Sequence, residues 1–354
     1  MTRLDRYIAR HVVQGTLVWL IALVALFSFI AFIDDVDNVG RGDYTTVMAL
    51  EYMLLTMPGL TFELFPLAAL IGALMGLGTL SSSSELTVIR SSGVSVRRIC
   101  AAVMAGAAGL IVIAVCIGEL IAPTAEQFAQ ARRSLALTDA LTLNTRSGFW
   151  IRDGNSFINI RRVLENNEMR EVSIYEFDAE NRLRVATRAD KARHENDKWQ
   201  LDGIVQSHLA DDGVQVRRIP AAVWDSLFDP ELVSVVAVDP EMLSIIGLRR
   251  YIGYLGKNGL DTARFEFALW HKFIYPLATG VMILLAVPLV LGRLKSSGLG
   301  QRIVVGVIVG ISFHVISQAA GQFGLVYGLS AAISATMPSA LFAIAAMWML
   351  SRIR

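Results

Sequence analysis

The sequence predicts an α-helical polytopic membrane protein with six transmembrane helices and one inserted all-β domain of the sandwich or jelly-roll type. Hydrophobic residues make up 54% of the 354 residues and charged residues only 18%, with a mean hydropathy of +0.52. Soluble domains carry about 25% charged residues. The charges are also clustered, because residues 124–268 hold 41 of the 63 charged side chains. The composition therefore excludes an ordinary soluble enzyme and a fibrous, disordered or disulfide-stapled protein.

Six apolar stretches are long enough to cross a bilayer, since a membrane-spanning helix needs about 20 mostly apolar residues. They are 12–33, 59–80, 100–122, 270–291, 303–323 and 329–350. Two of them carry small residues one helical turn apart, Gly72 with Gly76 and Gly306 with Gly310. Such spacing lets helices approach closely, and its simplest interpretation is packing within this chain.

The flanking charges predict the orientation of the spans. Basic residues gather at both termini and in the segments between spans two and three and between spans four and five: Arg3, Arg6, Arg10, Arg90, Arg97, Arg98, Arg293, Lys295, Arg302, Arg352 and Arg354. The opposite loops carry one arginine among four aspartates, and no charge at 324–330. Positive residues favour the cytoplasmic side, so both termini are expected there and the segment after the third span is expected outside.

The chain divides into membrane helices at 1–123, an extramembrane domain at 124–268 and further membrane helices at 269–354. In the central domain, short alternating runs separated by turn residues predict strands. The expected strands are 148–152, 156–163, 172–177, 183–192, 199–207 and 214–219, with a later one near 233–238. Helical stretches at 125–137 and 243–255 are expected to connect this domain to the membrane.

The sequence lacks the motifs of a catalytic or metal site. It has no HExxH, GxSxG or CxxC pattern, and His194 and His208 are isolated in the central domain. That domain has 19 basic and 22 acidic residues, whereas nucleic-acid binding requires a basic surface. We therefore expect no catalytic residue, no metal, no bound cofactor and no nucleic-acid partner.

The cytoplasmic loop between spans two and three predicts a short helix at about 82–93. Ser82 and Glu85 have the spacing of a capping box, and Gly93 is a natural helix end. This helix has two interpretations: it rests on the lipid interface, or it docks a cytoplasmic partner. Docking is favoured because the sequence lacks a GxxxxGK[ST] phosphate-binding motif. The chain therefore has no nucleotide site of its own, and a partner would have to supply the energy. An ion-driven carrier would need titratable residues near the middle of the membrane. The single candidate in this chain is His314, and a lone histidine there is more typical of a structural residue than of an ion relay.

Several motifs resemble the LptF/LptG (YjgP/YjgQ) family of lipopolysaccharide export permeases. They are Leu4-Asp5-Arg6-Tyr7-Ile8, the run from Pro66 to Leu74, the loop from Ser84 to Gly93, and the Gly118-Glu119…Ala122-Pro123…Glu126-Gln127 exit from the third span. The opening and the Val326-Tyr327-Gly328 turn are most similar to the LptG branch. The six-span layout fits as well, so the resemblance covers nearly the whole chain.

The resemblance implies one half of an ABC exporter in the inner membrane of Gram-negative bacteria. Its implied partners are a sister permease like LptF, an ATPase dimer like LptB, the protein LptC, the bridge protein LptA, lipopolysaccharide and membrane lipids. ATP would be used by the partner ATPase. The central domain would be a periplasmic β-jellyroll that passes lipopolysaccharide toward the bridge.

The resemblance also implies roles for individual residues. The cytoplasmic loop corresponds to the helix that couples the family's permeases to the ATPase, which places Glu85, Leu86, Ile89 and Arg90 at that contact. Arg132 and Arg133 lie on the segment where the family meets the phosphorylated head group, and guanidinium groups suit phosphate. Some members carry a lysine late in the first span, where this chain has Ala31 followed by acidic residues.

Two alternatives remain open at this stage. A membrane sensor or scaffold with an outside ligand domain would need a sizeable cytoplasmic output domain, and the longest cytoplasmic segment here is about twenty residues. A permease of another lipid or lipoprotein exporter usually has four spans with the outside domain after the first. Here that domain follows the third span.

Overall fold

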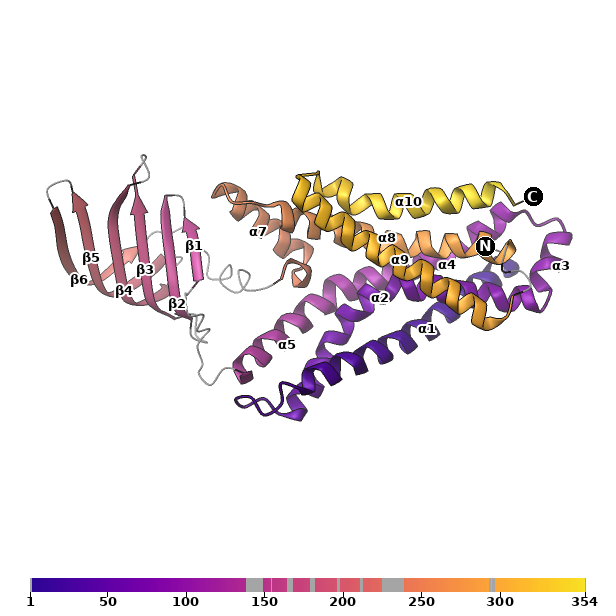
Figure 1. Ribbon diagram of the computed structural model, residues 1–354, viewed down its shortest axis with the longest axis horizontal. Helices are drawn as coiled ribbons and strands as arrows, with labels where there is room; N and C mark the ends of the chain where they lie inside the picture. Colours follow the sequence, from indigo (N-terminus) through magenta and orange to yellow (C-terminus); the bar gives the residue numbers. More distant parts are fainter. Residues whose placement is uncertain are drawn as a thin grey trace.

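The computed structural model describes residues 2–137, 149–153, 155–163, 168–178, 182–195, 198–210, 213–224, 239–292, 294 and 297–353. A helical membrane part and a β-sheet lie at opposite ends of an elongated molecule (Figure 1). Both termini and a short helix, α3 (Glu85–Ser91), lie together at the end away from the sheet (Figure 1). This arrangement agrees with the three spans that precede the inserted domain, because an odd number of crossings takes the chain to the end opposite its N-terminus.

Six helices of the described chain are long and apolar enough to cross a membrane. They are α1 (Arg3–Val36), α2 (Thr46–Ser82), α4 (Val96–Cys116) continued through the π-helix η1 (Ile117–Ile121) into α5 (Ala122–Leu137), α8 (Ala263–Leu291), α9 (Leu299–Tyr327) and α10 (Ala331–Ser351). Each coincides with a predicted span, so the six-span prediction is confirmed. The helices are longer than the apolar stretches. The 37 residues of α2 measure about 55 Å, whereas the hydrocarbon layer is about 30 Å thick, so α2 extends beyond the membrane.

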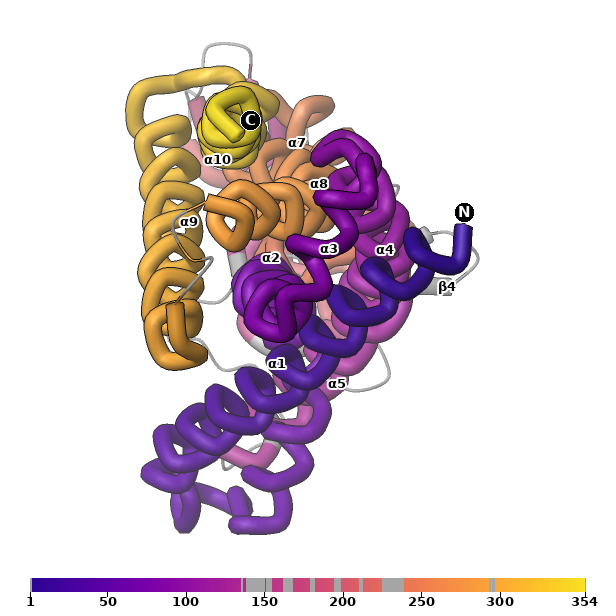
Figure 2. Tube along the Cα trace, turned by 90° about the vertical axis from the view of Figure 1, so that its right-hand side faces the viewer, coloured from indigo at the N-terminus to yellow at the C-terminus, as the bar shows by residue number. Residues whose placement is uncertain are grey.

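Helices α2 and α8 form the middle of the membrane part. Viewed along the long axis, α9 and α10 lie on one side of them and α1 and α4 on the other (Figure 2). The fully buried residues of α2 include Ala68, Ala69 and Ala73, and those of α8 include Ala278 and Ala286. Small side chains at these positions let the helix axes come close. Close packing then stabilises the bundle, because lipid tails are as apolar as the side chains and burial gives little hydrophobic free energy.

The small-residue pairs pack within this chain. A Cβ atom on Gly72 would meet the backbone of Gly15 and Thr16 in α1, and one on Gly76 would meet the His11 carbonyl. Those on Gly306 and Gly310 would meet side chains of α2. Both pairs therefore hold α1 and α9 against α2, as their simplest interpretation predicted.

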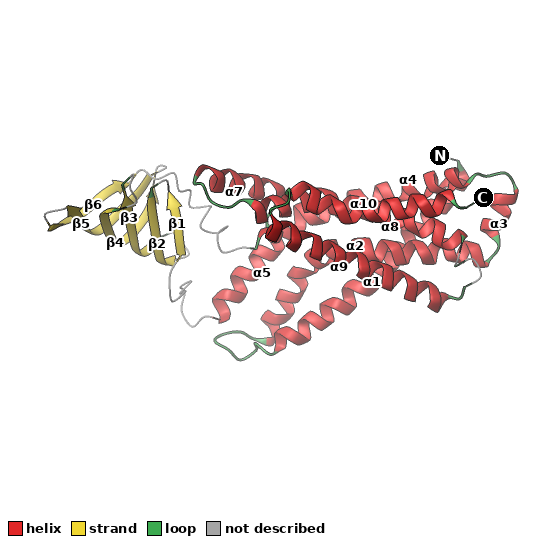
Figure 3. Ribbon diagram, turned by 45° about the horizontal axis from the view of Figure 1, so that its top comes forward, coloured by secondary structure: helices red, strands yellow, loops and turns green. Residues whose placement is uncertain are grey.

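The inserted domain is a six-stranded antiparallel sheet whose strands follow chain order (Figure 3). The strands are β1 (Phe149–Asp153), β2 (Ser156–Val163), β3 (Met169–Phe177), β4 (Leu183–Glu195), β5 (Lys198–Ala210) and β6 (Gly213–Trp224). Six predicted strands are thus found, and the seventh, 233–238, lies outside the described residues. The all-β inserted domain is confirmed, while the described strands make a meander without the Greek-key crossings of a jelly roll, because each pairs with its chain neighbour.

One face of the sheet carries the apolar core of this domain. Ile158, Val172, Ala189 and Trp199 are buried there, and the cluster continues into Tyr251 of α7 (Ile245–Lys257). The predicted connecting helices at 125–137 and 243–255 correspond to α5 and α7. Helix α7 therefore joins the core of the sheet to the chain that enters α8.

The α1–α2 contact should be intolerant of added volume. We expect Gly72→Ile to lower the stability of the purified protein by at least about 1–3 kcal/mol, the usual cost of overpacking, because its side chain would enter the α1 backbone. Thermal unfolding in detergent measures the change. Gly109→Ile in α4 is the matched control, since a Cβ there has no heavy atom within 4 Å. Equal loss in both variants would contradict this packing.

Candidate functional site

The short helix α3 lies at the cytoplasm-predicted end and begins later than the sequence indicates. The predicted capping box of Ser82 with Glu85 is wrong: the N-cap is Ser84, which has a left-handed backbone (φ 62°) and no side-chain cap. Ser82 still belongs to α2, and its hydroxyl donates to the Thr79 carbonyl. Gly93 (φ +91°) follows the helix as predicted, in a conformation that glycine adopts at little cost.

Glu85 is held by two hydroxyl groups. Tyr7 of α1 donates to its Oε2 at 2.8 Å, and Ser83 donates to its Oε1 at 2.9 Å. These bonds, the Tyr7 bond foremost, lower the pKa of Glu85 below its usual value, because they stabilise the charged form. The carboxylate is therefore ionised at neutral pH and is tied directly to the first turns of α1.

The other α3 residues differ in burial: one anchors the helix in the membrane core and the others are at least partly exposed. Leu86 is buried (2% exposed) in the main membrane core. Ile89 and Arg90 are half-buried, and Val88 is 63% exposed. The sequence indicated neither Tyr7 nor Val88 for this site. Tyr7 lies 78 residues from Glu85, so local spacing gave no signal for their hydrogen bond.

At the opposite end, Arg132 and Arg133 on α5 pair with acidic residues. Arg133 donates to Asp35 of α1 at 2.7 Å, and Arg132 pairs with Glu51 of α2. Tyr44 also donates to Asp35, and burial, followed by this bond, raises the Tyr44 pKa above its ordinary value. The space among these side chains is only about 10 Å³, room for one water at most.

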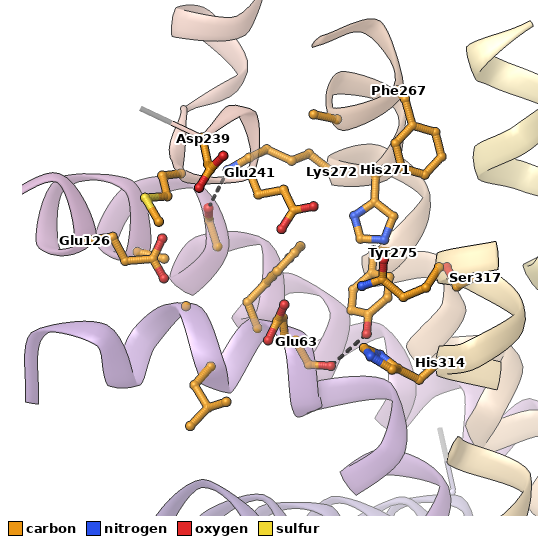
Figure 4. Close-up of a pocket in the computed structure, with 18 residues that line it drawn as sticks. Glu63, Glu126, Asp239, Glu241, Phe267, His271, Lys272, Tyr275, His314 and Ser317 are labelled. Carbon is orange, nitrogen blue, oxygen red and sulfur yellow. Dashed lines mark hydrogen bonds between the residues drawn. The ribbon is translucent and has the colours of Figure 1, made fainter. Parts of the chain in front are cut away.

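A larger cavity of about 240 Å³ lies among α2, α5, α8, α9 and the 3-10 turn η2 (Pro240–Met242) (Figure 4). Its charged and titratable lining residues are Glu63, Glu126, Asp239, Glu241, His271, Lys272 and His314. Tyr275 closes one side and donates to the Glu63 carbonyl at 2.7 Å. Of these residues, the sequence drew attention only to His314, as a titratable residue within a span, and to Glu126, as part of a family motif. Their convergence with residues of α2, α8 and η2 had no local signature.

The π-helix η1 positions Lys272 at this cavity. The Nζ of Lys272 donates to the Gly118 carbonyl at 3.3 Å and lies 4.0 Å from Glu119 Oε2. Glu119 Oε1 accepts the Ile245 N–H at 2.7 Å and so fixes the start of α7. The Lys272 side chain is only 9% exposed, so it is buried beside the cavity instead of extending outward to solvent.

Three of the four acidic residues that line the cavity have no hydrogen-bond or ion-pair partner among the described residues. Asp239 pairs with Arg264 at 3.0 Å. In the part of the chain that the structure describes, the carboxylates of Glu63, Glu126 and Glu241 make no hydrogen bond or ion pair. In the same part, no group of three or more His, Cys, Asp or Glu residues is arranged to hold a metal ion.

The sequence matches one family along almost its whole length. The profile of the lipopolysaccharide export system permease LptF/LptG family covers residues 6–352. The chain is 37% identical to the lipopolysaccharide export system permease protein LptG of Haemophilus influenzae over 353 residues, covering 99% of each chain. It is 36% identical to the protein of the same name from Escherichia coli K12 over 352 residues, covering 99% of this chain and 98% of the relative.

Helix α5, which leads from the membrane part toward the β domain, is called the stalk. Replacing its two arginines, Arg132 and Arg133, should affect the stability of the protein differently. Arg133→Met leaves Asp35, whose side chain is 6% exposed, as a buried charge without its partner, which costs about 3–5 kcal/mol. Arg132→Met breaks a pair whose side chains are 48% and 36% exposed, worth about 0–1 kcal/mol. We expect a clearly lower unfolding midpoint in detergent for the Arg133 variant only. Indistinguishable midpoints would show that the Arg133–Asp35 pair is not structural.

Proposed function

We infer the function of this chain from its family, since it belongs to the LptF/LptG family of lipopolysaccharide export system permeases. We propose that it is one permease subunit of an ABC exporter that extracts lipopolysaccharide from the inner membrane and passes it through its β domain toward a periplasmic bridge. The observation that carries this proposal is the separation of α3 and the sheet at opposite ends of one helical unit (Figure 1). Family membership also sets aside the sensor and lipoprotein-permease alternatives.

Extraction of a lipid needs an energy source outside this chain. Each methylene that leaves the bilayer costs about 0.8 kcal/mol, and lipopolysaccharide carries several acyl chains. The sequence has no GxxxxGK[ST] motif, so we assign ATP hydrolysis to a separate ATPase dimer of the LptB kind. The basic residues near α3 support a cytoplasmic location for that end, where ATP is available.

Helix α3 is the proposed contact with the ATPase. Leu86 anchors it in the membrane core, and Val88 faces outward. Glu85 is an ionised acceptor already bound to α1 through Tyr7, so a force on α3 acts on α1 as well as on α2. This geometry supports Glu85, Leu86, Ile89 and Arg90 as the residues through which nucleotide-driven motion enters the permease.

The apolar surface supports a second permease beside this one. Ile21 of α1, Ile308 of α9 and Val326 of α9 are 70%, 59% and 76% exposed. We propose an LptF-like sister permease against part of this surface, with lipid against the rest. LptC and the LptA bridge are proposed as further partners, with the β domain in the periplasm.

Reversing the charge of Glu85 tests the coupling. We expect Glu85→Lys to reduce lipopolysaccharide release per ATP hydrolysed by about tenfold or more, since a hydrogen bond to a charged group is worth about 1.5–3 kcal/mol and 1.4 kcal/mol is a factor of ten. Release is measured from proteoliposomes containing the assembled complex. Thr87→Ser, at an exposed position of the same helix, is the control. Normal release by the Glu85 variant in an intact complex would remove the coupling role.

The more exposed stalk arginine tests contact with the head group. We expect a photo-crosslinking residue at Phe128, which is 52% exposed beside Arg132, to capture lipopolysaccharide. Capture should fall several-fold in Arg132→Glu because a phosphate would then meet a carboxylate. Arg161→Glu, in the β domain, is the charge-matched control. Unchanged capture in the Arg132 variant would count against a head-group role for this arginine.

A further inference from the structure

We propose that the cavity among α2, α8 and α9 (Figure 4) binds the zwitterionic head group of a bilayer aminophospholipid. The ammonium group lies against the carboxylates of Glu63, Glu126 and Glu241, and the phosphate lies against Lys272. This site is separate from α3 and from the stalk arginines. It requires only that the chain is a membrane-spanning permease, and it goes beyond the export function.

The three carboxylates that have no partner among the described residues favour a positive group in the cavity. Glu63 and Glu126 come from α2 and α5, Glu241 comes from η2, and none makes a hydrogen bond or ion pair within the described residues. Asp239 is already balanced by Arg264. Glu126 is half-buried, and Glu63 and Glu241 are exposed where they line the cavity. Like charges that share one cavity repel one another, so the cavity has a local excess of negative charge that a bound ammonium group would neutralise.

The buried lysine provides a binding site for the phosphate half of the ligand. An ammonium group has three N–H donors. Lys272 Nζ uses one on the Gly118 carbonyl. It also forms an ion pair with Glu119 at 4.0 Å, a distance too long for a hydrogen bond, so its other two donors are not used there. The side chain is nine-tenths buried, so water supplies little compensation. A phosphate oxygen at this position would accept the remaining donors in charge-assisted bonds.

The size of the cavity and the spread of its ligands favour an organic zwitterion over a metal ion. A water takes up about 30 Å³ in the liquid, so about 240 Å³ accommodates a group of several non-hydrogen atoms. The acidic residues do not converge on one point, because no group of three or more ligands suited to a metal is found among the described residues. An ammonium group joined to a phosphate by a short linker spans such a lining.

The location identifies the ligand as a lipid. The lining residues His271, Lys272 and Tyr275 belong to α8, and His314, Ser317 and Gln318 belong to α9, both of which are membrane-spanning helices. Helix α9 packs mainly on α2 and α10 and hardly on α8, so the cavity occupies the space between α8 and α9. A head group bound there bridges the two helices and fixes their separation.

Competition between two lipids tests the site. The assembled complex is purified in nanodiscs containing equal amounts of phosphatidylethanolamine and phosphatidylglycerol with the same acyl chains, and retained lipid is counted by native mass spectrometry. We expect the wild type to retain phosphatidylethanolamine with about tenfold preference, which corresponds to about 1.4 kcal/mol. Equal retention of the two lipids by the wild type would overturn the proposal.

Charge-removing variants connect the preference to the cavity. The double variant Glu63→Gln with Glu126→Gln should lose the preference for phosphatidylethanolamine, and Lys272→Gln should lower retention of both lipids. The control Asp34→Asn with Asp37→Asn removes two charges from the exposed end of α1 and should retain the wild-type preference. A preference that survives in the Glu63/Glu126 variant would overturn the assignment, provided that helix content measured by circular dichroism is unchanged.

Two further arms identify the source of the head group. Soluble phosphoethanolamine should displace the retained lipid, whereas inorganic phosphate should not, because it lacks the ammonium group. Phosphatidylethanolamine should be retained without lipopolysaccharide in the preparation. Retention of an aminophosphate group only when it is carried by lipopolysaccharide would overturn the assignment to a bilayer phospholipid. Lipopolysaccharide release, measured separately, distinguishes failure of this site from failure of the export function.

Discussion

The close approach of α1 and α9 to α2 is the constraint on which the rest of the structure depends. In hydrocarbon, helices gain little from burying apolar surface and must associate by close packing. Gly72 and Gly76 allow the α1 backbone to reach α2, and Gly306 and Gly310 allow the same for α9. Helix α2 is continuous from Thr46, near the stalk, to Ser82, beside α3. A displacement of α3 is therefore transmitted to helices that reach the outer end.

Polar interactions are concentrated at the two ends of this packed unit. At one end, Tyr7 and Glu85 connect α1 with α3. At the other end, Asp35 and Arg133 connect α1 with α5, and Glu119 connects the π-helix with α7. Helix α1 is thus tied to α3, the proposed contact with the ATPase, and to α5, the helix that leads toward the β domain. This is the connection that a transporter needs if work done on one side of a membrane is to move a lipid toward the other side.

The sequence predicted the elements of this fold much better than it predicted their contacts. Apolar length alone located the six spans, because hydrocarbon tolerates few charges, and alternation located the strands to within a few residues. The helix cap at Ser82 was misplaced because α2 continues through that residue. The Tyr7–Glu85 bond, the Arg133–Asp35 pair and the cavity around Lys272 join residues that are far apart in the sequence. No local pattern encodes such contacts, so the family resemblance could indicate Arg133 but nothing in the sequence indicated its partner.

The central claim is that α3 and the β-sheet lie on opposite sides of the inner membrane. The most direct measurement is cysteine labelling with a membrane-impermeant maleimide in spheroplasts, in a background of Cys100→Ala and Cys116→Ser. Val214→Cys, on a strand position that is 61% exposed, should be labelled in intact spheroplasts. Ser91→Cys, on exposed α3 surface, should be labelled only after the membrane is permeabilised. The reverse pattern, or labelling of both in intact spheroplasts, would contradict the account.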